Sequence, residues 1–238
     1  MIKSLKAKKG TLAWDCVNSK ELTNLKQINV LIGGNGAGKT TWIKGIINGE
    51  VEIFTDKEIK VFKYDNEKNF KNINIPLHLV SDGLDYLLHK TLACSEGQMA
   101  MISISSFLEY VKENLSKDKT NVILLDEVDT GMGSDTVNAL LWEISDLLMY
   151  YDEEIQLFIS SNNYHWIYFF KYGLDIVNNK WEKINSYDEY YSILEKNHKK
   201  ILDKNTDFIH LGKYENNPCC EIVFDDIEVN IIDKENKI

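Results

Sequence analysis

The chain has 238 residues, of which 44% are hydrophobic and 27% charged, and its formal net charge is −10. This length suits one α/β domain, and the acidity does not indicate nucleic-acid binding, although an acidic chain can still carry a local basic patch. No run of about 18 apolar residues occurs, and none follows the basic start MIKSLKAKKG, so we expect neither a membrane span nor a signal peptide. The 4 cysteines show no CxxC spacing, which predicts reduced thiols in a cytoplasmic protein rather than a metal site.

The N-terminal part reads as strands around a glycine-rich turn. Alternating and β-forming residues predict two strands around Lys9-Gly10, and a short apolar run ends in glycines, as a buried strand that feeds a turn does. The segment TTWIKGIIN after those glycines has helical spacing and stops near Gly49. The predicted strands are 2–8, 11–17, 27–32, 51–54 and 59–64.

The remainder alternates between helices and buried strands. A polar loop ending at Pro76 precedes a short helix with Ser81 as its N-cap, and MAMISISSFLEYVKENL after Gly97 reads as one long helix. Two apolar runs predict further buried strands, and GLDIVNN with NKWEKI predicts a final hairpin. The predicted strands are 121–126 and 154–160, and the predicted helices are 81–90, 134–150 and 187–202.

This alternation of strands and helices predicts an α/β fold with a mostly parallel core sheet. The N-terminal strands predict an antiparallel β part, and residues 65–116 a short helical insertion. We expect one domain over residues 1–204, followed by a C-terminal appendage over 205–238 that holds Pro218 and two adjacent cysteines.

A phosphate-binding loop is predicted at residues 33–41. The run GGNGAGKT fits the pattern G-x-x-x-x-G-K-[ST], and a buried strand precedes it while a helix follows. Glycines let the backbone take positive φ, and the helix N-terminus offers N–H groups to an anion. Lys39 would contact the β and γ phosphates of ATP, and Thr40 would bind Mg²⁺. The predicted nucleotide contacts are Asn35, Gly36, Ala37, Gly38, Lys39, Thr40 and Thr41.

Two acids follow the predicted strand VILLD. Ligands of open α/β sheets lie at the carboxyl ends of strands, so Asp126 would approach the Mg²⁺ held by Thr40. Glu127 could orient and deprotonate the attacking water. The alternative is that both acids are helix N-terminal charges favoured by the dipole. The phosphate loop favours catalysis, with Glu127 and Lys39 as the catalytic residues.

The stretch Ser95-Glu96-Gly97-Gln98 lies between these motifs, before the long helix. Taken with GGNGAGKTT and VILLDE, it resembles the signature of the ABC ATPase superfamily; by itself it also reads as a serine N-cap. The resemblance implies a P-loop fold, Mg-ATP as the ligand, and a homodimer that sandwiches two nucleotides. Ser95, Gly97 and Gln98 would then contact the ATP bound to the partner.

The chain looks more similar to small predicted ATPases of the RecF, SMC and overcoming-lysogenization-defect groups than to transporter subunits. The helix after Gln98 has no arginine, whereas a transporter signature usually runs into a Q-R-x-x-[IL]-A-R-A-L helix. Asn162 stands at the position of the switch histidine, and His165 could replace it only if the loop bends. The loop VDTGMGSD after Glu127 also lacks the usual proline and the usual L-D pair. These departures predict slow hydrolysis.

Two further residues have alternative readings. Trp14 lies near where transporters place an aromatic that stacks on adenine, but an aromatic on an alternating strand is more often part of the core. Glu67 falls where the resemblance would place a loop that senses Mg²⁺ or water, but a solvated loop fits it equally well.

Three functions follow from these patterns. The first is an ATP-driven homodimer that switches a protein effector, such as a nuclease, in DNA repair or antiphage defence, with any nucleic acid handled by that partner or by a local patch. The second is the ATPase subunit of an ABC transporter, which the missing Q-R helix and histidine disfavour. The third is an ATP-bound scaffold without turnover, which an intact Glu127 disfavours.

Overall fold

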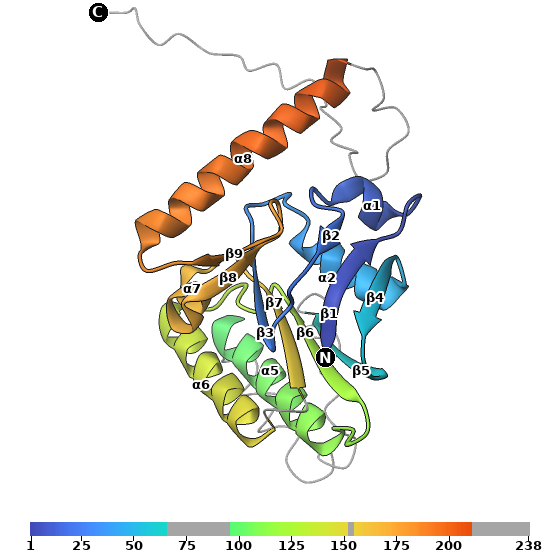
Figure 1. Cartoon of the computed structure of the whole chain (residues 1–238). Coiled ribbons are helices and arrows are strands. Elements are labelled where there is room, and N and C mark those ends of the chain that lie inside the picture. The colour runs from blue at the N-terminus through green and yellow to red at the C-terminus, as the bar shows by residue number, and fades with distance from the viewer. Residues whose placement is uncertain (66–95, 152–154, 211–238) are drawn as a thin grey trace, which may run out of the picture.

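The computed structural model describes residues 1–65, 96–151 and 155–210 (Figure 1). The strands in chain order are β1 (Ile2–Ala7), β2 (Glu21–Leu22), β3 (Ile28–Ile32), β4 (Val51–Thr55), β5 (Ile59–Asp65), β6 (Thr120–Asp126), β7 (Ile155–Ser160), β8 (Tyr172–Asp175) and β9 (Lys180–Lys183). The helices are α1 (Leu12–Cys16), α2 (Lys39–Asn48), α5 (Glu96–Glu113), α6 (Ser134–Tyr150), α7 (Tyr164–Phe170) and α8 (Tyr187–His210). The predicted helix 81–90 lies outside the described residues.

A sheet with the strand order β5-β6-β7-β3-β8-β9 forms the centre of the molecule. Its strands pair in parallel except at the β8–β9 hairpin, which is antiparallel. A second sheet, ordered β2-β1-β4, is antiparallel throughout. The predicted α/β fold with a parallel core and an antiparallel N-terminal part is therefore confirmed.

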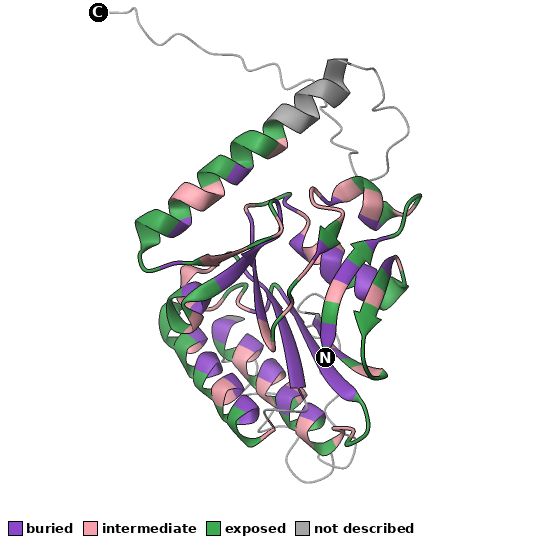
Figure 2. Ribbon diagram, in the orientation of Figure 1, coloured by how far each residue is buried: buried purple, intermediate pink, exposed green. Residues whose placement is uncertain are grey.

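The central strands are buried on both faces, as Figure 2 shows by their purple ribbons. Alternate residues of β6 enter opposite cores: Ile123 and Leu125 pack towards α5 and α6, while Val122 and Leu124 pack towards α2 and the antiparallel sheet. Because the strands are covered on both faces, their apolar residues are consecutive, as in 122–125 of β6 and 157–159 of β7, rather than alternating. This burial fixes β6 and β7 as rigid supports for the residues at their carboxyl ends.

The predicted strand 11–17 is wrong, because the structure has helix α1 there. The Thr11 side chain caps this helix by accepting from the Trp14 N–H at 3.3 Å. A Glu50 carboxylate oxygen accepts from the Ala13 N–H at 2.9 Å, and Ala13 is buried close to Gly45 of α2. Capping and contact with α2 therefore outweigh the alternating pattern, and β1 pairs with β2 and β4 instead.

The two sheets are joined through the buried Gln156 of β7. Its amide oxygen accepts from the Ile2 N–H at 2.7 Å, and its amide nitrogen donates to the Ile2 and Lys26 carbonyls at 2.9 and 2.8 Å. Gln156→Leu would leave two buried backbone groups of Ile2 and the part-buried Lys26 carbonyl without these partners, so we expect a loss of about 3 kcal/mol in unfolding free energy. Urea unfolding measures it, with Asn138→Leu on the exposed face of α6 as the control. A loss no larger than that of the control would contradict the bridging role.

Helix α8 is tied to the β8–β9 hairpin by polar side chains, of which Asp175 and Asn197 are buried. Asp175 accepts from the side chains of Asn197 and Asn178, at 3.0 and 2.7 Å, and Asn178 also donates to Asn197. This network holds the middle of α8 over the hairpin and positions Tyr187, at the start of the helix, near the carboxyl ends of β6 and β7. The helix continues to His210, beyond the predicted end at 202.

Candidate nucleotide site

The loop of residues 33–38 joins β3 to α2, as the sequence predicts. Gly36 and Gly38 have φ angles of 76° and 95°, which side chains rarely adopt. A Cβ atom at Gly33 would lie 2.5 Å from that of Ala37. Glycine is therefore required both for the backbone conformation and for the tight packing of the turn.

This loop surrounds a cavity of about 370 Å³. Its lining residues are Cys16, Gly34, Asn35, Gly36, Ala37, Gly38, Lys39, Thr40, Thr41, Glu127 and Asn162. The first N–H groups of a helix have no partner within the helix, so the start of α2 offers donors to an anion. The structure thus brings all seven predicted nucleotide contacts of the loop around one hollow.

The Lys39 side chain is buried and folded back onto the loop. Its ammonium group donates to the carbonyls of Gly33 and Gly34 and, at 2.8 Å, to the amide oxygen of Asn162. Burial lowers the pKa of the Lys39 amine, while the carboxylates of Glu127, Asp126 and Asp129 oppose this effect. A lysine side chain held beside this cavity suits contact with an anion.

Thr40, which lines the cavity, forms an oxygen pair with Asp126. The Thr40 hydroxyl donates to a carboxylate oxygen of Asp126 at 3.0 Å, and Asp126 is buried at the end of β6. Two neighbouring ligands of an octahedral Mg²⁺ ion with bonds of about 2.0–2.1 Å lie about 3 Å apart. The hydroxyl and carboxylate therefore fit Mg²⁺ in both chemistry and spacing.

Glu127 follows β6 and faces the open side of the site. Its φ angle is 48°, in the left-handed region, and its N–H donates to the Ser160 carbonyl of β7 at 2.9 Å. Helix α6 starts only at Ser134 and has Asp135 as its first-turn acid. The alternative reading of Asp126 and Glu127 as helix N-terminal charges is therefore wrong.

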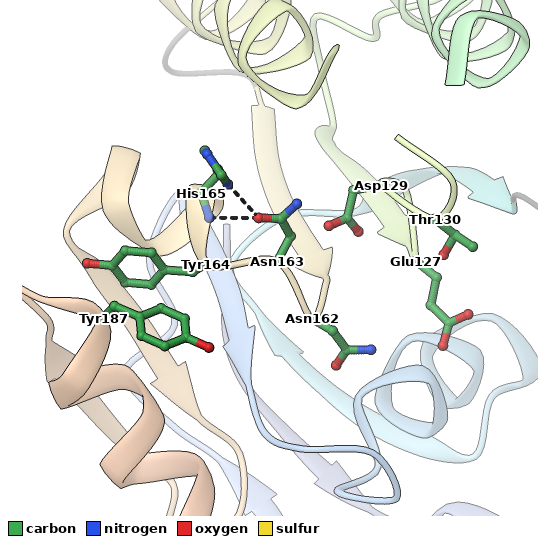
Figure 3. Close-up of a pocket in the computed structure, with 8 residues that line it drawn as sticks. All are labelled: Glu127, Asp129, Thr130, Asn162, Asn163, Tyr164, His165 and Tyr187. Carbon is green, nitrogen blue, oxygen red and sulfur yellow. Dashed lines mark hydrogen bonds between the residues drawn. The ribbon is translucent and has the colours of Figure 1, made fainter. Parts of the chain in front are cut away.

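A second, larger cavity of about 530 Å³ adjoins the loop; we call it the tyrosine cavity (Figure 3). Its lining residues are Glu127, Asp129, Thr130, Asn162, Asn163, Tyr164, His165 and Tyr187. Glu127 and Asn162 line both cavities. The two hollows therefore meet at the residue predicted to act as general base.

The switch position after β7 is occupied by Asn162, which contacts Lys39 as described. Figure 3 shows His165 beyond Asn163, on the side away from Glu127. Its ring nitrogen Nδ1 lies 2.7 Å from the Asn163 side-chain oxygen, which also caps α7. His165 lines the tyrosine cavity, but Asn162 lies nearer to the loop lysine.

Asp129 is a site residue to which the sequence analysis assigned no role. It accepts from the Ser161 hydroxyl at 2.6 Å, and that hydroxyl accepts from the Asn163 N–H at 2.8 Å. Asp129 thereby links the loop after β6 to the loop after β7. Burial raises the pKa of this carboxyl group, and the Ser161 hydrogen bond opposes the rise. The sequence could have indicated Asp129 as a site residue, because it lies two residues after Glu127 and so near the same edge of the sheet.

Tyr190 of α8 packs beside this site, with its ring 5.5 Å from that of Tyr164. Burial, with a smaller contribution from Asp129, raises the Tyr190 pKa to about 12. Because the folded state holds the phenolic proton more tightly, this contribution to stability is complete below about pH 10 and is lost as the pH rises to about 12. We expect wild type to lose roughly 2–3 kcal/mol over this range relative to Tyr190→Phe. Urea unfolding at pH 9 and pH 12 checks this; parallel losses in the two proteins would contradict it.

Of the predicted signature contacts, the structure describes Gly97 and Gln98. Ser95 lies outside the described residues, and α5 begins at Glu96. Gly97 is buried, and a Cβ atom there would lie 3.1 Å from the carbonyl oxygen of Gly131 in the loop after Glu127. Gln98 is exposed. Neither Gly97 nor Gln98 lines the two cavities, so contact with a partner's nucleotide stays a prediction.

The remaining predicted roles have different outcomes. Trp14 lies on α1 rather than on a strand, packs against the core and carries the Lys20 ammonium group 5.2 Å from its ring centre. It does not line the loop cavity, and adenine stacking stays a prediction. Glu67 lies outside the described residues.

Within the described ranges, no cluster of three His, Cys, Asp or Glu suits a metal, and no helix has the length and apolar character needed to cross a membrane.

Comparison with protein-family models finds no match, and comparison with curated proteins finds none. Among solved structures, the chain is similar to CbiO1 from Clostridium perfringens, part of the ABC transporter complex CbiONQ. The identity is 15%, the TM-score 0.44, and 89% of this chain and 97% of the other are covered. It is also similar to a nucleotide-free ATP-binding cassette from an ABC transporter, at 16% identity and a TM-score of 0.44, with 82% and 96% covered.

Proposed function

We propose that the protein binds Mg-ATP at residues 33–41 and hydrolyses it slowly. The observation that carries this proposal is the meeting of four side chains at one sheet edge. The Thr40 hydroxyl and an Asp126 carboxylate oxygen lie 3.0 Å apart, and Lys39, Thr40 and Glu127 line the same cavity. This set supplies a metal pair, a phosphate contact and a general base for phosphoryl transfer to water.

The reaction needs little covalent chemistry from the chain. Mg²⁺, held by Thr40 and Asp126, would neutralise charge on the β and γ phosphates. Lys39 would exchange its loop carbonyls and Asn162 for phosphate oxygens, and stabilise charge in the transition state. Glu127 would accept a proton from the water that attacks the γ-phosphorus, while ADP leaves on the opposite side.

We further propose that ATP closes a head-to-tail homodimer of the ABC type. Support comes from the resemblance of Ser95, Gly97 and Gln98 to the ABC signature, and from the exposure of Gln98 and Glu127. Closure and reopening would switch a protein effector, with nuclease regulation in DNA repair or antiphage defence as the role that we favour. The other candidates are the ATPase subunit of an ABC transporter and an ATP-bound scaffold.

Light scattering on Glu127→Gln protein, with and without Mg-ATP, tests the switch together with phosphate release by wild type. A mass that doubles with Mg-ATP, and slow wild-type release, are the expected results. A constant mass and no released phosphate would refute the self-sufficient switch. Doubling without release would favour the scaffold, and co-purification with a membrane protein would favour the transporter subunit.

A further inference from the structure

The tyrosine cavity has a wall that the proposed hydrolysis does not use. Asp129, Tyr164 and Tyr187 are lining residues without a part in that reaction, while Glu127 and Asn162 connect the cavity to the nucleotide loop. Figure 3 shows Tyr164 and Tyr187 on one side of the hollow, and Asp129 and Glu127 on the other. A volume of about 530 Å³ accommodates a large side chain next to the place of the γ-phosphate.

The lining of this cavity is complementary to a cation. It includes two carboxyl groups, Glu127 and Asp129, and no lysine. Lys39 lies nearby, but it is bonded to the loop carbonyls and to Asn162. Asp129 is partly buried, and this burial raises its pKa more than the attraction of Lys39 lowers it. A positive group that enters the cavity would be attracted by both carboxylates.

The tyrosine rings favour a guanidinium group over an ammonium group. Tyr164 and Tyr187 have ring centres 5.4 Å apart and an interplanar angle of 89°, so their faces point in different directions. A planar guanidinium stacks on aromatic faces and bonds carboxylates with two parallel N–H groups. A lysine ammonium is a more strongly hydrated point charge without this planar fit.

The source of such a group is restricted by composition. All 27 basic residues among the 238 are lysines, and the sequence contains no arginine. A second copy of these residues therefore cannot supply a guanidinium group. We propose that the tyrosine cavity receives an arginine side chain from a different protein. The role of this arginine rests on the proposed function. Its guanidinium group would lie beside Glu127 and Asn162, where it stabilises charge on the γ-phosphate of ATP.

Binding is tested first without nucleotide, so that the result does not depend on hydrolysis. N-acetyl-arginine amide is titrated into protein with isotope-labelled tyrosine rings and followed by NMR, beside the lysine amide and the neutral citrulline amide. We expect saturable binding of the arginine compound alone, weakened about tenfold by Asp129→Asn. Asp146→Asn, at an exposed site on α6, is the matched control. Equal binding of the citrulline compound, or equal weakening in the control, would overturn the proposal.

A second pair of variants guards against a folding defect in Asp129→Asn. Tyr187→Leu removes an exposed ring of the cavity and should also weaken binding, whereas Tyr150→Leu on α6 should not. Phosphate release then tests the placement: saturating arginine compound should raise wild-type turnover about tenfold or more, but not that of Tyr187→Leu. Binding without acceleration would overturn the role at the γ-phosphate. Failure of wild type to bind ATP would instead refute the proposed function. The titration with the arginine compound would still show whether the tyrosine cavity binds a guanidinium group.

Discussion

Lys39→Met is expected to weaken Mg-ATP binding at least about 100-fold. Methionine keeps the length of the side chain but removes the ammonium group, which would donate charge-assisted hydrogen bonds to two phosphates. Each such bond contributes about 1.5–3 kcal/mol, and 1.4 kcal/mol corresponds to tenfold in affinity. Isothermal titration with Mg-ATP measures the change.

Lys44→Met provides the matched control, because Lys44 lies on the same helix α2 and is exposed. It should bind Mg-ATP as wild type does. Equal affinity in Lys39→Met and wild type would show that the loop does not hold the phosphates. A similar loss in both variants would point to a general effect of charge on α2.

Glu127→Gln should reduce phosphate release by about 10²- to 10⁴-fold, the usual contribution of a general base, without weakening Mg-ATP binding. Glutamine has the same shape and leaves the backbone bond from residue 127 to the Ser160 carbonyl in place. It cannot accept a proton from the attacking water at neutral pH. Single-turnover kinetics with labelled ATP separates this effect from slow product release.

Glu195→Gln, at an exposed site on α8, controls for the lost negative charge and should not change the rate. Retention of wild-type turnover in Glu127→Gln would mean that another group is the base. Asp129 is the next carboxyl group on the same cavity, so Asp129→Asn would then identify it. These outcomes distinguish a wrong residue assignment from a wrong reaction.

The sequence predicted those parts of the fold in which local pattern and burial agree. β6 and β7 carry runs of consecutive apolar residues because helices or the second sheet cover both of their faces, and that pattern is visible without a structure. The long helix α5 and the β8–β9 hairpin also appear where their spacing predicts them. Residues 11–17 did not follow their alternating pattern, because the contacts that decide their conformation come from Glu50 and α2, far along the chain.

The site shows the same division. The loop 33–41 with Asp126 follows from spacing alone, since each motif is contiguous and a strand carries it to the sheet edge. The tyrosine cavity does not follow, because Tyr187 and Asp129 are 58 positions apart and meet only through the anchoring of α8 to the hairpin. The sequence predicted that Asn162 stands where the ABC resemblance would place a histidine. It did not predict that the Asn162 side chain accepts a hydrogen bond from Lys39.

That contact has a consequence for the energetics of binding. Because the Lys39 ammonium group already donates to two carbonyls and Asn162, we expect ATP binding to be an exchange of partners rather than a gain of new ones. Asn162→Ala removes one of the competing partners and should tighten ATP binding about fivefold, as the same titration would show; an unchanged affinity would contradict the exchange. The strength of the Lys39 hydrogen bonds to the carbonyls and Asn162 therefore helps to set the dissociation constant for ATP. The fraction of protein with bound ATP would then respond to changes of the ATP concentration around that value.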